Sequence, residues 1–130
     1  MSDGENARRL LALAAKDLQA LEGMLDTKAF ATEIFGFHAQ QAVEKALKAW
    51  LSFAGVACPR THDLGVLFSS LSQSAQPVPP DFHALEQLTD FAVQFRYEAF
   101  DTLGEDLDRA DILRRVTEFV THVGKLGSGP

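Results

Sequence analysis

The 130-residue chain lacks several features that would place it in a large class of proteins. It has a single cysteine, Cys58, so no internal disulfide can form, and no cluster of cysteine and histidine has the spacing of a zinc site. No stretch approaches the ~18 uninterrupted apolar residues of a membrane-spanning helix. The polar, acidic start of the chain is unlike a signal peptide. We therefore expect a cytoplasmic protein that needs neither a cofactor nor a metal and has no contact with a membrane.

Motifs of common enzyme chemistries are also missing, because the sequence shows no glycine-rich phosphate loop, carboxylate dyad or nucleophile motif. Basic residues are few, and the net charge of −6 is unlike that of a general nucleic-acid binder. Residues 38–62 are the exception, since Lys45, Lys48 and Arg60 are opposed there only by Glu44. A small basic island in an acidic protein fits one compact anion better than a long polyanion.

Helix-forming residues are abundant, above all in residues 33–54. This segment contains no proline, and Gly55 follows it where a left-handed C-cap glycine belongs. Apolar residues occupy so much of its circumference that we expect other helices to clasp it on several sides. Asp26 and Thr27 are expected to cap the entry to this central helix.

Apolar residues recur at helical spacing through most of the remaining chain. Further helices are predicted over residues 7–25, over about 64–71 after Thr61 or Asp63, from Pro80 to about Tyr97, and along an apolar seam from Ile112 to Leu126. No internal repeat and no strand pattern is visible. The predicted fold is all-α: an antiparallel bundle of four long helices plus one short helix, forming one domain over residues 1–126 with a disordered tail at 127–130.

Three segments together resemble a known family: residues 37–48 (FHAQQAVEKALK), 60–64 (RTHDL) and 95–98 (FRYE). They are similar to the HEPN domain, in particular to small stand-alone HEPN proteins of bacteria and archaea, and the likeness covers roughly residues 7–124. The resemblance implies a helical bundle that forms a homodimer and binds a nucleotide or RNA. It also implies a minimal nucleotidyltransferase as partner in a toxin–antitoxin-like pair, and many members cleave RNA without a metal.

Ribonuclease members of that family carry an arginine followed by a histidine after four to six positions. The arginine would steady the phosphate, and the histidine would act as base or acid on the 2′-hydroxyl. Arg96 is the corresponding arginine here, but positions 101 to 103 hold Asp, Thr and Leu. Arg115 and His122 are seven residues apart, which places them about 10 Å apart along a helix. We therefore favour a non-catalytic module, and the alternative is a metal-independent endoribonuclease that uses Arg115 and His122, or Arg96 with a histidine from elsewhere.

The candidate nucleotide-binding residues are Lys45, Lys48, Arg60, His62, Arg96 and Tyr97. They form one cationic and aromatic pocket if the central helix, the 60–63 loop and the end of the helix that starts at Pro80 meet at one end of the bundle. Arginine offers bidentate contact to phosphate, and a tyrosine ring offers stacking to a base. The same residues could instead form a buried polar network in a purely structural or interaction protein. The sequence leaves both readings open.

Overall fold

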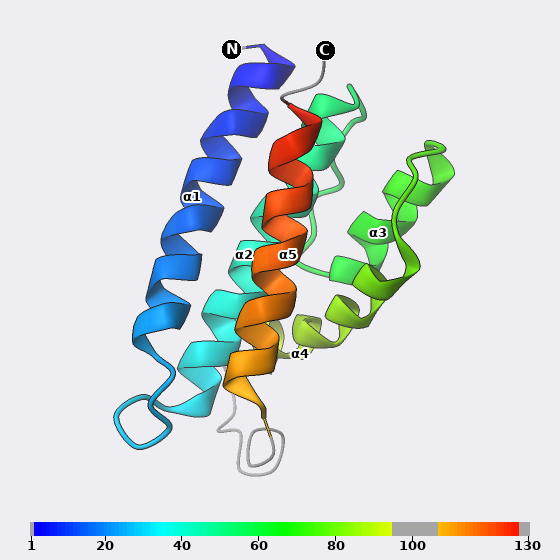
Figure 1. Ribbon diagram of the computed structural model, residues 1–130. Coiled ribbons are helices and arrows are strands. Elements are labelled where there is room, and N and C mark those ends of the chain that lie inside the picture. Colours follow the sequence, from blue (N-terminus) through cyan, green and yellow to red (C-terminus); the bar gives the residue numbers. More distant parts are fainter. Residues whose placement is uncertain (1, 95–106, 128–130) are drawn as a thin grey trace.

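The computed structural model describes residues 2–94 and 107–127, which form a bundle of helices without a strand (Figure 1). Its elements are α1 (Asp3–Gly23), α2 (Thr32–Phe53), α3 (Leu64–Gln73), the 3₁₀ helix η1 (Pro80–Leu88), α4 (Thr89–Gln94) and α5 (Arg109–Leu126). The long helices α1, α2 and α5 lie side by side, and α3, η1 and α4 pack beside them. The predicted all-α bundle is confirmed.

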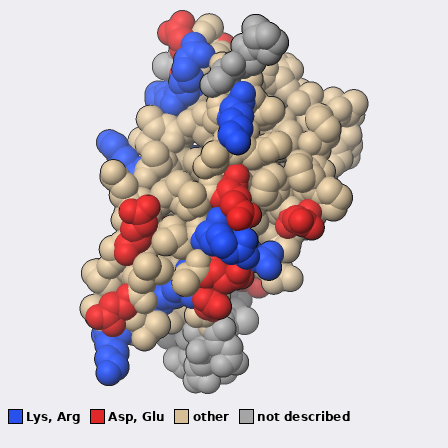
Figure 2. All heavy atoms as spheres, in the orientation of Figure 1, with Lys and Arg blue, Asp and Glu red and all other residues tan. Residues whose placement is uncertain are grey.

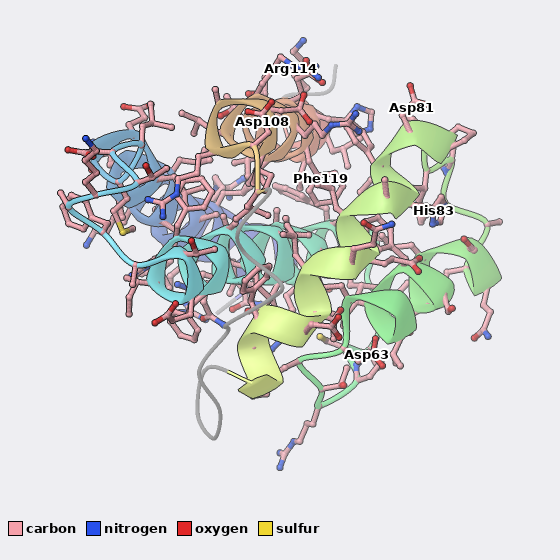
Figure 3. All side chains as sticks on the ribbon, turned by 90° about the horizontal axis from the view of Figure 1, so that it is seen from below. Asp63, Asp81, His83, Asp108, Arg114 and Phe119 are labelled. Atoms are coloured by element: carbon pink, nitrogen blue, oxygen red, sulfur yellow. The ribbon has the colours of Figure 1, made fainter. Side chains whose placement is uncertain are left out.

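Helix α2 is the centre of the bundle and contacts every other helix. Its largest buried side chain is Trp50, which is 1% exposed. The Trp50 ring packs on Phe119 of α5 with 6.3 Å between ring centroids, and its indole N–H donates to Gln76 Oε1 at 3.0 Å. Burial of one such side chain contributes roughly 2–3 kcal/mol. Figure 3 shows Phe119 pointing into the interior between α5, α2 and η1.

The predicted end of α2 is confirmed and its predicted start lies within one residue of the observed one, but the predicted cap at Asp26 and Thr27 is wrong. Gly55 has a φ of 69°, and the Val56 N–H donates to the Leu51 carbonyl at 2.9 Å, as expected after a left-handed glycine. At the other end, α2 begins after Ala31, which makes no side-chain cap. Asp26 Oδ1 instead accepts from the Lys28 N–H at 2.9 Å, so this carboxylate stabilises a turn several residues before the helix.

The caps of α1 and α3 explain where these helices begin. Helix α1 starts four residues before the predicted position because Ser2 Oγ accepts from the Glu5 N–H at 3.1 Å. Helix α3 starts after Asp63, whose Oδ1 accepts from the Gly65 N–H at 2.9 Å. Asp63 is one of the two residues predicted to open this helix. It is also the last residue of the connection from α2 to α3, which includes the 60–63 loop.

The segment that begins at Pro80 starts as predicted but has 3₁₀ geometry over its first nine residues. Its apolar residues Phe82, Leu85, Leu88 and Phe91 are spaced by three, and a 3₁₀ helix has three residues per turn. This spacing keeps them on one side, where the last three are 5–6% exposed. The predicted end of this helix near Tyr97 and most of the predicted tail lie outside the described residues.

Arg109, the first residue of α5, is 4% exposed and ties down the connection between α1 and α2. Its guanidinium donates to the backbone oxygens of Met24 (2.7 Å), Asp26 (3.2 Å) and Phe30 (2.8 Å) and to the Thr32 hydroxyl (3.3 Å). The same guanidinium lies 5.3 Å from the centroid of the Phe35 ring. One buried cation therefore satisfies a group of backbone acceptors that no helix could satisfy.

Helix α4 approaches α2 so closely at Gly36 that there is no room for a side chain. A Cβ at this position would lie 2.2 Å from Cδ1 of the Phe91 ring. We expect Gly36→Ala to lower the free energy of unfolding by about 2 kcal/mol, because the ring must move within a packed core. Urea denaturation measures this, with Gly124→Ala as the control. A Cβ at Gly124 meets nothing within 4 Å, so that change should be neutral or stabilise α5 by up to about 1 kcal/mol. Equal losses in both variants would contradict the prediction.

Candidate functional site

A buried carboxylate, Glu44, organises the polar side chains at the middle of α2. Glu44 is 5% exposed. Its Oε1 accepts from Gln40 Nε2 at 2.9 Å and lies 2.8 Å from His62 Nδ1, and its Oε2 accepts from Lys48 Nζ at 3.0 Å. Gln40, Glu44 and Lys48 share one face of α2 because they are four residues apart. Gln40 Nε2 also donates to the backbone oxygen of His62 at 3.2 Å, which fixes the 60–63 loop to α2.

The hydrogen bonds keep Glu44 charged. Burial by itself would raise the pKa of Glu44, but the hydrogen bonds from Gln40, His62 and Lys48 outweigh it and lower the pKa below the ordinary 4.5. An ionised carboxylate only accepts hydrogen bonds, so the proton of the shared contact belongs to His62 Nδ1. The His62 side chain is 56% exposed. Its Nε2 is therefore the nitrogen left for a ligand, on a ring held in a fixed orientation.

The structure brings Lys48 and His62 together but separates Lys45 from them. Lys45 Nζ donates to Asp17 Oδ2 of α1 at 2.7 Å, and His38 Nδ1 lies 2.9 Å from Oδ1 of the same carboxylate. Asp17 is 7% exposed and was not singled out from the sequence. The sequence did contain a sign of its burial, because Asp17 lies on the same helical face as Ala14 and Leu21, which are both buried. Lys45 thus belongs to a second acid-centred cluster between α1 and α2.

The other candidate residues have different surroundings. Arg60 is exposed on the loop that carries His62, and it makes no ion pair with any residue that the structure describes. Arg96 and Tyr97 lie outside the described residues. Cys58 is exposed beside the cluster, and partial burial of its thiol raises the pKa above the ordinary value, with Lys48 opposing the shift.

Arg115 and His122 do not share a contact. Arg115 Nε donates to Asp111 Oδ2 at 2.8 Å on the exposed side of α5. The His122 ring instead packs with its centroid 5.3 Å from those of Trp50 and Phe82. One side chain therefore belongs to a surface ion pair and the other to the edge of the core.

Residues 2–94 and 107–127 contain neither a metal-binding cluster nor a membrane-spanning helix. Within these ranges no three or more His, Cys, Asp or Glu side chains are placed to hold a metal ion. None of the described helices is both long enough and apolar enough to cross a membrane. The arrangement around Glu44 instead combines the ammonium group of Lys48 with an oriented imidazole, and the exposed Arg60 lies two residues before His62 in the chain. The ammonium and guanidinium groups are donors suited to an anion.

Comparison with known proteins identifies the family. The model of the HEPN domain matches residues 7–126, which is nearly the whole chain. No curated protein and no solved structure matches significantly.

Proposed function

The chain belongs to the HEPN domain family, and we propose that it is a nucleotide- or RNA-binding module that is not catalytic by itself. The observation that supports this most is His62, whose Nδ1 is anchored on buried Glu44 while 56% of its side chain is exposed. A ring held in this way keeps Nε2 available to an incoming ligand at little cost in side-chain entropy. Lys48, which bonds the same carboxylate, and Arg60, two residues before His62 in the chain, add positive charge.

Proposed site residues are Lys48, Arg60 and His62, together with Arg96 and Tyr97 through their match to the family pattern. Lys48 would donate to a phosphate oxygen, and Arg60 would contact the phosphate with two N–H groups. His62 Nε2 would accept a hydrogen bond from a hydroxyl or amino group of the ligand. Lys45 is left with a supporting role, because its ammonium pairs with Asp17 of α1 at 2.7 Å and does not join the residues around Glu44. Tyr97 would supply a ring on which a base could stack.

The proposed biological setting rests on the family. We propose a cytoplasmic homodimer that is paired with a minimal nucleotidyltransferase in a toxin–antitoxin-like system. Light scattering of the purified protein tests the dimer, and co-purification with such a transferase tests the pairing.

The binding site can be tested with Arg60→Ala. We expect the dissociation constant for nucleotide or short RNA to rise about tenfold, because a charge-assisted contact to phosphate contributes roughly 1.5–3 kcal/mol. Fluorescence anisotropy at two salt concentrations measures it, and wild-type affinity should fall as salt rises. Arg8→Ala removes an exposed arginine from α1 and is the matched control. Equal effects of the two variants would remove Arg60 from the site.

The endoribonuclease alternative is tested with the same preparations. RNA incubated with the wild-type protein in EDTA should stay intact. If the wild type cleaves RNA and His122→Ala does not, with the helical content unchanged, the protein is a metal-independent ribonuclease that uses His122 and the proposed non-catalytic function is wrong.

A further inference from the structure

A surface hollow lies beside the Glu44 cluster, between the start of α1, the end of α2 and the connector that follows α2. Its volume is about 510 Å³, within the range of small-molecule sites. The polar side chains that line it include Asn6, Arg9, Lys48, Ser52 and Cys58. Lys48 is shared, because its ammonium bonds Glu44 while the side chain also lines the hollow.

A chain of hydrogen bonds holds Arg9 at the hollow. Arg9 Nη2 donates to Asn6 Oδ1 at 3.0 Å, and Asn6 Nδ2 donates to Ser52 Oγ at 3.2 Å across the interface between α1 and α2. The Ser52 hydroxyl, on a residue that is 9% exposed, donates in turn to the backbone oxygen of Asp3 at 2.7 Å. These bonds fix the amide with its oxygen toward Arg9, so the guanidinium is positioned before any ligand arrives.

No described carboxylate neutralises the charge of Arg9. Its hydrogen-bond partner Asn6 is a neutral amide, and Arg9 forms no ion pair with a described residue. The carboxylate of Asp3 also lines the hollow, and Glu44 balances Lys48. The net local charge is therefore small. An anion would be held by directed contacts to Arg9 and Lys48, and a ligand that contacts several donors would be favoured over a single phosphate.

On the face formed by α1 and α5, helix α5 offers no unpaired arginine in addition to Arg9 and Lys48 at the hollow. Arg114 and Arg115 are paired with Asp111 and Glu118 along α5. Figure 2 shows acidic and basic side chains interleaved on this face. A bound polyanion would therefore contact the protein over only a short length.

We propose that the hollow is a second phosphate subsite and that the ligand is a short single-stranded RNA segment. This rests on the proposed function of the Glu44 cluster. One backbone phosphate contacts Arg60, a ribose hydroxyl donates to His62 Nε2, and a neighbouring phosphate reaches Lys48 and Arg9. The donors come from α1, α2 and the 60–63 loop, so a ligand with phosphates at successive positions can contact all of them, whereas a nucleoside monophosphate contacts one end.

Binding of AMP, ATP and oligoadenylates of two, four and eight nucleotides tests the proposal. We expect the tetranucleotide to bind at least tenfold more tightly than AMP, and Arg9→Ala to remove about tenfold of that affinity without changing AMP binding. The salt dependence of tetranucleotide binding should also fall, by about 0.7 in logarithmic slope for one lost phosphate contact to a single strand. Arg8→Ala, next to Arg9 but outside the hollow, should bind as the wild type does.

Each other outcome has a distinct meaning. Loss of affinity in Arg60→Ala but not in Arg9→Ala would overturn the second subsite and leave the proposed function standing. ATP that binds as tightly as the tetranucleotide, with the same sensitivity to Arg9→Ala, would assign the phosphates to a free nucleotide and overturn the RNA ligand. No binding of any of these compounds would overturn the second subsite and the proposed function together.

The single cysteine allows a test without mutation, because Cys58 is exposed and lines the hollow. Its reaction with the uncharged reagent 4,4′-dithiodipyridine can be followed at about pH 8.5, where a thiol of raised pKa still ionises in part. We expect saturating tetranucleotide to slow the reaction several-fold and saturating AMP to leave it unchanged. A rate that the tetranucleotide does not alter would place the RNA elsewhere and overturn the subsite.

Discussion

Arg109→Met is expected to lower the free energy of unfolding by about 4 kcal/mol, the largest effect of any single change proposed for this protein. The methionine keeps most of the buried volume of the side chain but removes the guanidinium that donates to the Met24 and Phe30 backbone oxygens in the connection between α1 and α2. Several backbone oxygens then lose their partners, and each buried unpaired acceptor costs roughly 1–3 kcal/mol, less where water can enter. Urea denaturation monitored by circular dichroism gives the value.

Two further variants show whether the geometry of Arg109 or its charge is responsible. Arg109→Lys keeps the charge but has no planar fork of donors, so it should recover less than half of the loss. Arg114→Met removes an exposed arginine of the same helix, whose solvent-screened ion pairs with Asp111 and Glu118 should add little to stability. A wild-type stability in Arg109→Met would mean that the connector carbonyls are satisfied by water.

The role of Arg109 could not be predicted from the sequence. It is the only basic residue among the acids of residues 98–111, which suggests an ion pair with one of its neighbours. Its partners are instead backbone oxygens about 80 residues earlier in the chain. Every residue carries the same backbone carbonyl, so no side-chain pattern marks those acceptors.

The helices were predictable because their signals are local. Apolar spacing, Gly55 and Asp63 identified α2 and α3, and the caps confirm two of these signals. The N-terminal cap of α2 was not predictable from Asp26, because an aspartate can stabilise a turn as well as a helix. The 3₁₀ geometry of η1 was visible in the spacing of three between Phe82, Leu85 and Leu88, but a spacing of three also occurs in α-helices.

The candidate site was predictable only in part. Lys45 and Lys48 were grouped as one basic island, yet they serve different clusters because residues 44 and 45 project about 100° apart on a helix. The Glu44–Lys48 pair was visible as a spacing of four residues. Its burial was not visible, because Glu44 is covered by the 60–63 loop, whose contacting residue His62 is 18 positions later in the chain.

That burial is the basis of the second large effect. Glu44→Gln is expected to lower the free energy of unfolding by about 3 kcal/mol at pH 7, near the lower end for breaking a buried ion pair because Lys48 and His62 reach solvent. The amide offers one oxygen where the carboxylate offers two, and its N–H₂ group faces either the donors of Gln40 and His62 or that of Lys48. Urea denaturation measures the loss, and Glu22→Gln, on the exposed side of α1, should cost less than about 0.5 kcal/mol.

The dependence of this loss on pH separates charge from packing. Because the pKa of Glu44 is lower in the folded protein than its ordinary 4.5, the unfolded chain binds this proton more readily. The contribution of the carboxylate to stability is therefore fully present above about pH 4.5 and is lost as the pH falls through the lowered folded-state value. The difference between wild type and Glu44→Gln should thus be large at pH 7 and should shrink at about pH 3. A difference that stays constant would mean that the glutamate acts through its shape alone, and His62 would then have no charged anchor to hold it toward a ligand.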